Sequence, residues 1–143
     1  MAIVGPTASG KSDLAIQAAR RFAGEIVSCD SVQVYRGLDI GSGKPSIEDR
    51  RQVRHHLIDI LDLDEEMNAG VFASRAAEAI EDITARGLLP IVTGGTGLYL
   101  TALLKGLFEH GGADPEVRAR LEALAERHGP ARLHRLLPHL DPP

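Results

Sequence analysis

A phosphate-binding loop lies close to the amino terminus of this chain. Residues 5–12 match the pattern G-x-x-x-x-G-K-[ST] and follow a short apolar run, residues 2–4. The loop glycines allow successive backbone N–H groups to point at one phosphate at the start of a helix. Lys11 adds positive charge for the outer oxygens of a diphosphate, and the Ser12 hydroxyl suits a Mg²⁺ ion. The pattern predicts a diphosphate or nucleotide site, including ATP, formed by Gly5, Pro6, Thr7, Ala8, Ser9, Gly10, Lys11 and Ser12.

Asp30 is a second residue that could do chemistry. It comes just after the expected strand 25–28, and in a parallel sheet this places it at the same edge as the phosphate loop. A carboxylate there could serve as a general base. From the residues alone, capping of a short helix is the favoured interpretation of Asp30, because Asp is a common N-cap residue. Asp59 could be a magnesium-associated acid, but one acid after an apolar run is a weak signal, and we leave it unassigned.

The elements that must position these residues alternate between strands and helices. Strands are expected at 3–4, 25–28, 57–60 and 88–92, and residues 36–54 are expected to be irregular. One helix follows the phosphate loop and ends near Gly24, a second is closed by Gly87, and a third starts near Leu98. The apolar positions that predict the first two helices are Leu14, Ala15, Ala18 and Ala19, and then Phe72, Ala76, Ala79, Ile80 and Ile83. This order predicts an α/β fold, a P-loop NTPase-like parallel sheet flanked by helices.

The character of the chain changes after Phe108. A glycine-containing linker leads to Asp114-Pro115, a strong helix start, and a second helical piece spans 131–137. We therefore expect a core at 1–108 and the beginning of a helical element at 109–143.

Composition and charge exclude some classes of protein. The chain has 143 residues and a formal net charge of -4, which is unusual for a free-standing nucleic-acid binder. The single cysteine, Cys29, excludes an internal disulfide, and a buried structural thiol is the preferred interpretation. With no apolar run of about 18 residues and no leader, we expect a cytoplasmic protein without a membrane segment.

Two groups of side chains leave alternatives open. The basic stretch formed by Lys44, Arg50, Arg51, Arg54, His55 and His56 could face an RNA backbone or be a solvated loop, and the two interpretations have equal weight. Tyr35 and Tyr99 could stack on a base, but Tyr99 is better explained as a core residue.

Five ordered motifs together closely resemble the tRNA dimethylallyltransferase (tRNA isopentenyltransferase) family. They are residues 5–12, 28–45, 55–59, 86–87 and 94–99, and they span almost the whole chain. The resemblance implies transfer of a dimethylallyl group from dimethylallyl diphosphate, held by the phosphate loop with Mg²⁺, to an adenosine beside the tRNA anticodon. It also implies that Asp30 is the general base and Lys11 assists the departing diphosphate. Contacts with tRNA are implied for Asp30, Ser31, Val32, Gln33, Thr96 and Arg118, whereas the oligomeric state stays unknown.

The chain also departs from the family pattern. It stops before the family's later Gln-Arg segment and a further diphosphate-binding arginine, so we interpret it as an incomplete fragment whose activity alone is in question. Three alternatives share the loop: a small-molecule kinase that uses ATP, an adenylate isopentenyltransferase that acts on free AMP or ADP, and a fragment that binds diphosphate without catalysis.

Overall fold

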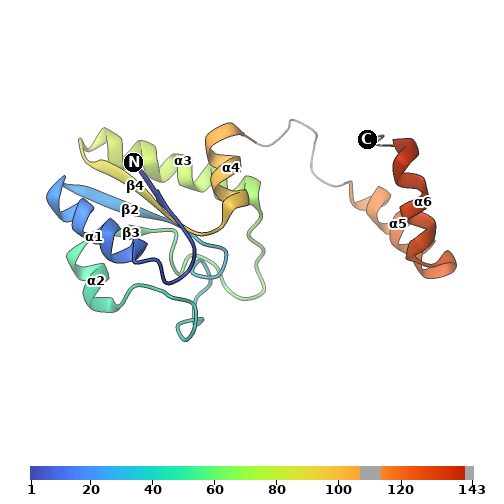
Figure 1. The fold of residues 1–143 in the computed structure, drawn as a ribbon, viewed down its shortest axis with the longest axis horizontal. Coiled ribbons are helices and arrows are strands. Elements are labelled where there is room, and N and C mark those ends of the chain that lie inside the picture. The colour runs from blue at the N-terminus through green and yellow to red at the C-terminus, as the bar shows by residue number, and fades with distance from the viewer. Residues whose placement is uncertain (107–113, 141–143) are drawn as a thin grey trace. The chain divides into compact units, whose positions relative to one another are not determined.

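The chain forms two compact units, Met1–Leu107 and Phe108–Pro143. The computed structural model describes residues 1–106 and 114–140 (Figure 1). The linker residues 107–113, which include part of the expected boundary, lie outside the described residues. Each unit is described by itself below.

A parallel sheet of four strands forms the centre of the first unit. Its strands are β1 (Ala2–Val4), β2 (Gly24–Cys29), β3 (His55–His56) and β4 (Leu89–Gly94), in the spatial order β1-β4-β2-β3. All three pairings are parallel, as the alternation of strands and helices predicts. The carboxyl ends of β1, β2 and β4 therefore meet at one edge, where Val4 and Cys29 both align with Gly94.

Helices cover both faces of this sheet, because successive strand residues point to opposite sides (Figure 1). Ile26 and Ile91 pack on one side with Ala15 and Ala19 of α1 (Lys11–Arg21). Val27 and its neighbours on the other side pack against α3 (Ala69–Ala85) and α4 (Gly97–Lys105). The result is a three-layer α/β arrangement, which confirms the predicted fold class.

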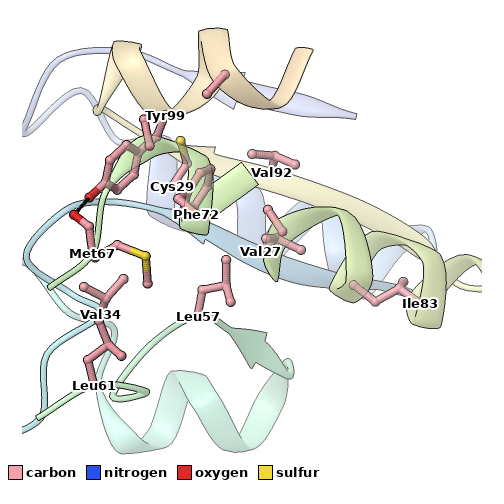
Figure 2. Close-up of a cluster of buried hydrophobic side chains, with 13 residues drawn as sticks. Val27, Cys29, Val34, Leu57, Leu61, Met67, Phe72, Ile83, Val92 and Tyr99 are labelled. Carbon is pink, nitrogen blue, oxygen red and sulfur yellow. Dashed lines mark hydrogen bonds between the residues drawn. The ribbon is translucent and has the colours of Figure 1, made fainter. Parts of the chain in front are cut away.

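An aromatic pair anchors the larger core, on the side of α3 and α4 (Figure 2). The rings of Phe72 and Tyr99 stack at a centroid distance of 4.6 Å with an angle of 16° between their planes. The Tyr99 hydroxyl donates a hydrogen bond to the Met67 carbonyl at 2.9 Å. Tyr99 is therefore a core residue, as expected. Cys29 is buried in the same cluster, and burial raises the pKa of its thiol to about 11, which fits a structural role.

The second unit contains two helices, α5 (Pro115–His128) and α6 (Pro130–Leu140). The Asp114 carboxylate caps α5 by accepting hydrogen bonds from Glu116 N and Val117 N, and Pro115 occupies the first helical turn. Across residues 1–106 and 114–140, the structure contains no helix with the length and apolarity needed to cross a membrane.

Three expectations about local structure were wrong. Residues 57–60 do not form a strand, because Leu57 and Asp59 have left-handed backbones (φ 61° and 55°) and β3 ends at His56. The segment 36–54 is not wholly irregular, because a capping box between Ser46 and Asp49 starts α2 (Ile47–Gln52). Gly24 does not cap α1, since it is the first residue of β2.

Candidate functional site

The phosphate loop connects β1 to the amino terminus of α1. Gly10 precedes the helix with φ 78°, a left-handed conformation that favours glycine, and Ala8 adopts φ 63°. The role expected for Gly5 differs in detail, because its φ is not left-handed and a Cβ there would lie 3.1 Å from the Ser9 Oγ. The Lys11 ammonium donates to the Pro6 carbonyl at 3.2 Å, within the loop itself. The loop thus has a helix start and a lysine where a phosphate ligand needs them.

A cavity of about 420 Å³ opens beside this loop at the carboxyl edge of the sheet. The predicted site residues that line it are Thr7, Ala8, Lys11, Ser12, Asp30, Val32 and Gln33. Gly5, Pro6 and Thr96 instead line a neighbouring cavity of about 250 Å³ with apolar residues such as Leu100. Neither cavity is lined by Ser9, Gly10 or Ser31. The fold therefore gathers half of the predicted site residues, including Lys11, Ser12 and Asp30, in one cavity.

Asp30 combines a structural contact with a position at the cavity. Its Oδ1 accepts hydrogen bonds from Val32 N at 2.8 Å and Gln33 N at 3.2 Å, which fixes the turn after β2. This is the capping interaction that the residues alone favoured, although it caps a turn and not a helix. Both contacts use Oδ1, and Oδ2 has no hydrogen-bond partner among residues 1–106 and 114–140, so it can serve a ligand in the cavity.

Thr96 joins the edge of β4 to the same turn. Its Oγ1 accepts a hydrogen bond from Ser31 N at 3.1 Å, so these two predicted residues are neighbours through a backbone contact. Close approach of β2 and β4 makes this possible, because a Cβ at Gly94 would lie 2.0 Å from the Cys29 carbonyl oxygen. Only glycine fits at Gly94, which explains part of the glycine-rich turn after β4.

Five residues of the cavity wall lie outside the predicted site, although all except Thr93 belong to the motifs 28–45 and 94–99: Gly41, Ser42, Gly43, Thr93 and Gly94. Two of them carry buried hydroxyl oxygens, Ser42 Oγ and Thr93 Oγ1, that have no hydrogen-bond partner among the described residues. Hydroxyl oxygens are hard ligands of the kind that suits Mg²⁺ and its water molecules. The donor set of the cavity, with Ser12 at the helix start, therefore fits the ion that the resemblance implies.

The basic stretch is only partly exposed to solvent. The Lys44 side chain is 3% exposed, and its ammonium donates to Asp59 Oδ1 at 2.6 Å and Asp39 Oδ1 at 2.9 Å. Burial alone would lower the Lys44 pKa, but the hydrogen bonds to Asp59 and Asp39 outweigh it, so the pKa is raised. Arg50 also pairs with Asp59. Lys44 thus neither faces an RNA backbone nor forms part of a solvated loop, whereas Arg51 and Arg54 are exposed.

Arg118, the remaining predicted site residue, belongs to the second unit. It lies on α5, and its Nε donates to Glu122 Oε1 at 3.0 Å across one helical turn. Its side chain is 72% exposed.

Comparison with known proteins identifies a family model and several relatives to which this chain is similar. A family model described as IPP transferase matches residues 33–143. The chain is 54% identical over 139 residues to the tRNA dimethylallyltransferase of Koribacter versatilis, which covers 97% of this chain and 45% of that protein. It is 53% identical over 141 residues to the enzyme of Methylococcus capsulatus, with 99% and 45% covered. The chain thus spans about half the length of these relatives.

Solved structures agree with this relationship. The tRNA isopentenylpyrophosphate transferase of Bacillus halodurans superposes with a TM-score of 0.73 at 44% identity, covering 99% of this chain and 47% of that one. A eukaryotic dimethylallyltransferase acting on tRNA gives a TM-score of 0.83 at 34% identity, with 99% and 35% covered. With a family model that matches most of its length, and with relatives more than half identical across nearly all of it, this chain belongs to the IPP transferase family.

Proposed function

We propose that this protein provides the donor-binding part of a tRNA dimethylallyltransferase. In this reaction, the dimethylallyl group moves from dimethylallyl diphosphate to the N6 amine of an adenosine beside the anticodon. The observation that supports the proposal most directly is the single cavity of about 420 Å³ that contains Lys11 and Ser12 of the phosphate loop together with Asp30. A diphosphate at the loop and an amine near the carboxylate fit this arrangement.

The residues of the cavity have separate tasks in the proposed reaction. A carbon–nitrogen bond forms to the adenine amine as the carbon–oxygen bond to the diphosphate breaks, and the amine loses a proton. Asp30 Oδ2 accepts that proton, while Oδ1 stays bonded to the turn at Val32 and Gln33. Lys11 and the loop amides stabilise the negative charge on the departing diphosphate. When Mg²⁺ is bound at Ser12, it supplies further positive charge there.

Partners and conditions follow from the same proposal. The acceptor is an unpaired anticodon loop, where a base leaves its stack at less cost than in a duplex. Part of the tRNA surface is assigned to Ser31, Thr96 and Arg118, and the unit at 109–143 is assigned to the start of a tRNA-binding helical insertion. The protein is expected to work in the cytoplasm.

The first test is binding of the donor by the 143-residue chain. Calorimetry with Mg²⁺ is expected to detect dimethylallyl diphosphate and pyrophosphate, with affinity reduced at least tenfold by Lys11→Ala, since a charged hydrogen-bond donor is lost. Asp64→Asn, which changes an exposed acid, serves as the control variant. Unchanged affinity in Lys11→Ala would refute the placement of the diphosphate.

The second test is transfer. Because relatives are about twice as long, the assay uses the chain alone and a chimera in which residues 1–143 replace the matching part of a relative. Labelled donor is offered with unmodified tRNA or AMP, and ATP consumption is followed in parallel. Label in tRNA supports the proposal, label in AMP favours an adenylate isopentenyltransferase, and ATP turnover with neither favours a kinase. Asp30→Asn is expected to reduce transfer by about 10²–10⁴-fold, the usual contribution of a general base.

A further inference from the structure

The loop Gly41-Ser42-Gly43 forms one wall of the phosphate cavity. None of its three residues belongs to the phosphate loop predicted from the sequence. These residues line the same cavity as Lys11 and Ser12. Gly41 and Gly43 have φ values of 76° and 64°, so the turn that presents Ser42 depends on left-handed backbone on both sides. This loop is therefore a built feature with a defined shape.

The Ser42 hydroxyl lacks a hydrogen-bond partner within the described part of the chain, although its oxygen is buried. Buried hydroxyls in native proteins nearly always have a partner, and an exception needs an explanation. The Thr93 hydroxyl, at the end of β4, is also buried without a partner and lines the same cavity. Two such groups beside Lys11 indicate that the missing partner is an oxygen-rich ligand.

Gln33 holds the loop from the side of β2. Its Nε2 donates to the Gly43 carbonyl at 2.9 Å and to the Ser42 carbonyl at 3.3 Å. Its Oε1 accepts a hydrogen bond from Ser28 Oγ at 2.9 Å, and Ser28 is buried within β2. The amide of Gln33 is thus oriented by the sheet and fixes both carbonyls of the loop.

Lys44, the next residue, holds the same carboxyl-terminal end of the loop. Its buried ammonium donates to the Tyr35 carbonyl at 2.7 Å, in addition to its contacts with Asp39 and Asp59. All three donors of the ammonium are used in these contacts. The backbone from the Ser42 carbonyl to Lys44 is therefore tied to Gln33, Tyr35 and Asp59, and these contacts restrict where the Ser42 side chain can lie before any ligand binds.

We propose that Ser42 is a further binding residue of this cavity, donating its hydroxyl proton to a phosphate oxygen of the ligand. Gln33 and Lys44 act as positioning residues that hold Ser42 in place. The proposal rests on the proposed function, since it assumes that the phosphate loop holds a diphosphate. A hydrogen bond from a hydroxyl to a charged phosphate oxygen is stronger than one between neutral groups, so its loss is measurable.

The direct test uses pyrophosphate with Mg²⁺ as the probe and the 143-residue chain. We expect Ser42→Ala to weaken binding about tenfold, as loss of a hydrogen bond to a charged group does, and Ser42→Thr to restore most of the affinity by keeping the hydroxyl. Ser74→Ala, which removes an exposed hydroxyl on α3, is the matched control and should bind like the unaltered chain. Equal affinity of Ser42→Ala and the unaltered chain would overturn the assignment of Ser42.

Two comparisons separate this inference from the proposed function. If Lys11→Ala weakens binding and Ser42→Ala does not, the diphosphate site stands and the inference about Ser42 fails. If Lys11→Ala binds normally, the placement of the diphosphate fails. For the positioning residues, Lys44→Met should speed amide hydrogen exchange at 39–44 and weaken binding, with no additional loss when Ser42→Ala is combined with it. Fully additive losses, or unchanged exchange in Lys44→Met, would refute the positioning role.

Discussion

A buried carboxylate at the amino end of β2 offers a quantitative test of the structure. Glu25 is 11% exposed at its side chain, and both of its oxygens are bonded by Arg86, at 2.6 Å and 2.7 Å. His56 Nε2 lies 2.6 Å from Oε2. This cluster ties β2 to β3 and to the end of α3, at the opposite end of β2 from the phosphate cavity.

The hydrogen bonds from Arg86 lower the Glu25 pKa from 4.5 to about 2, more than burial raises it. A shift of this size corresponds to about 3 kcal/mol in the free energy of unfolding. Because the folded pKa lies below the unfolded one, this stabilisation is present above pH 4.5 and is lost as the pH falls towards 2. Arg86→Met should therefore lower the free energy of unfolding at pH 7 by about 3 kcal/mol, since the carboxylate stays buried without its partner.

Urea unfolding followed by circular dichroism at pH 7, 4.5 and 3 measures the effect. The difference between the unaltered chain and Arg86→Met should shrink as the pH falls, because protonation of Glu25 removes the unpaired charge. Asp82→Asn is the control, because it removes the other acid that is bonded to Arg86. The Asp82 side chain is 56% exposed, so this variant should lower the free energy of unfolding by less than about 1 kcal/mol. A difference that does not change between pH 7 and 3 would refute the assignment of Glu25 as the source of the stability.

Two further predictions concern packing near the site. Gly94→Ala should lower the free energy of unfolding by about 1–3 kcal/mol, because its Cβ would lie 2.0 Å from the Cys29 carbonyl oxygen. Gly97→Ala, which has open space around its Cβ, should not destabilise the protein. Equal urea midpoints for the two variants would contradict this prediction. Tyr99→Phe should lower the free energy of unfolding by about 1–2 kcal/mol, because the buried Met67 carbonyl loses its hydrogen-bond donor, the Tyr99 hydroxyl. An unchanged melting profile would show that this hydrogen bond contributes nothing to stability.

The sequence could predict the parts of the fold that follow local periodicity. The helix with Phe72, Ala76 and Ile83 has those side chains fully buried, as the spacing indicates. The apolar run 57–60 was misread, since a short apolar segment is compatible with a strand and with a buried turn. Only the left-handed backbone at Leu57 and Asp59 decides between them, and Asp59 is held there by Lys44 and Arg50. Those contacts come from distant positions, which local patterns do not contain.

Local sequence patterns also predicted only part of the candidate site, because they do not contain contacts between distant positions. Spacing alone identified the phosphate loop because its residues are consecutive and their backbone makes the site. The pairing of Ser42 with Thr93 has no such signal, since residues 43–92, which include α2 and α3, must fold before the two hydroxyls reach one cavity. The same applies to Lys44, whose charge suggests a surface role although its side chain is buried and paired with Asp39 and Asp59.

Asp30 shows why opposing interpretations of one residue can both be useful. The residues alone favoured a cap, and the family resemblance implied a base. A carboxylate has two oxygens, and here the turn uses Oδ1. The cap fixes the side chain's orientation, and this is the condition that a proposed base needs in order to present Oδ2 to an amine. Asp30→Asn keeps an oxygen for the turn but loses the basic group, whereas Asp30→Ala loses both. Comparing their stabilities with their transfer rates therefore separates the two roles: only Asp30→Ala should be destabilised, by about 1 kcal/mol, while both variants should lose transfer.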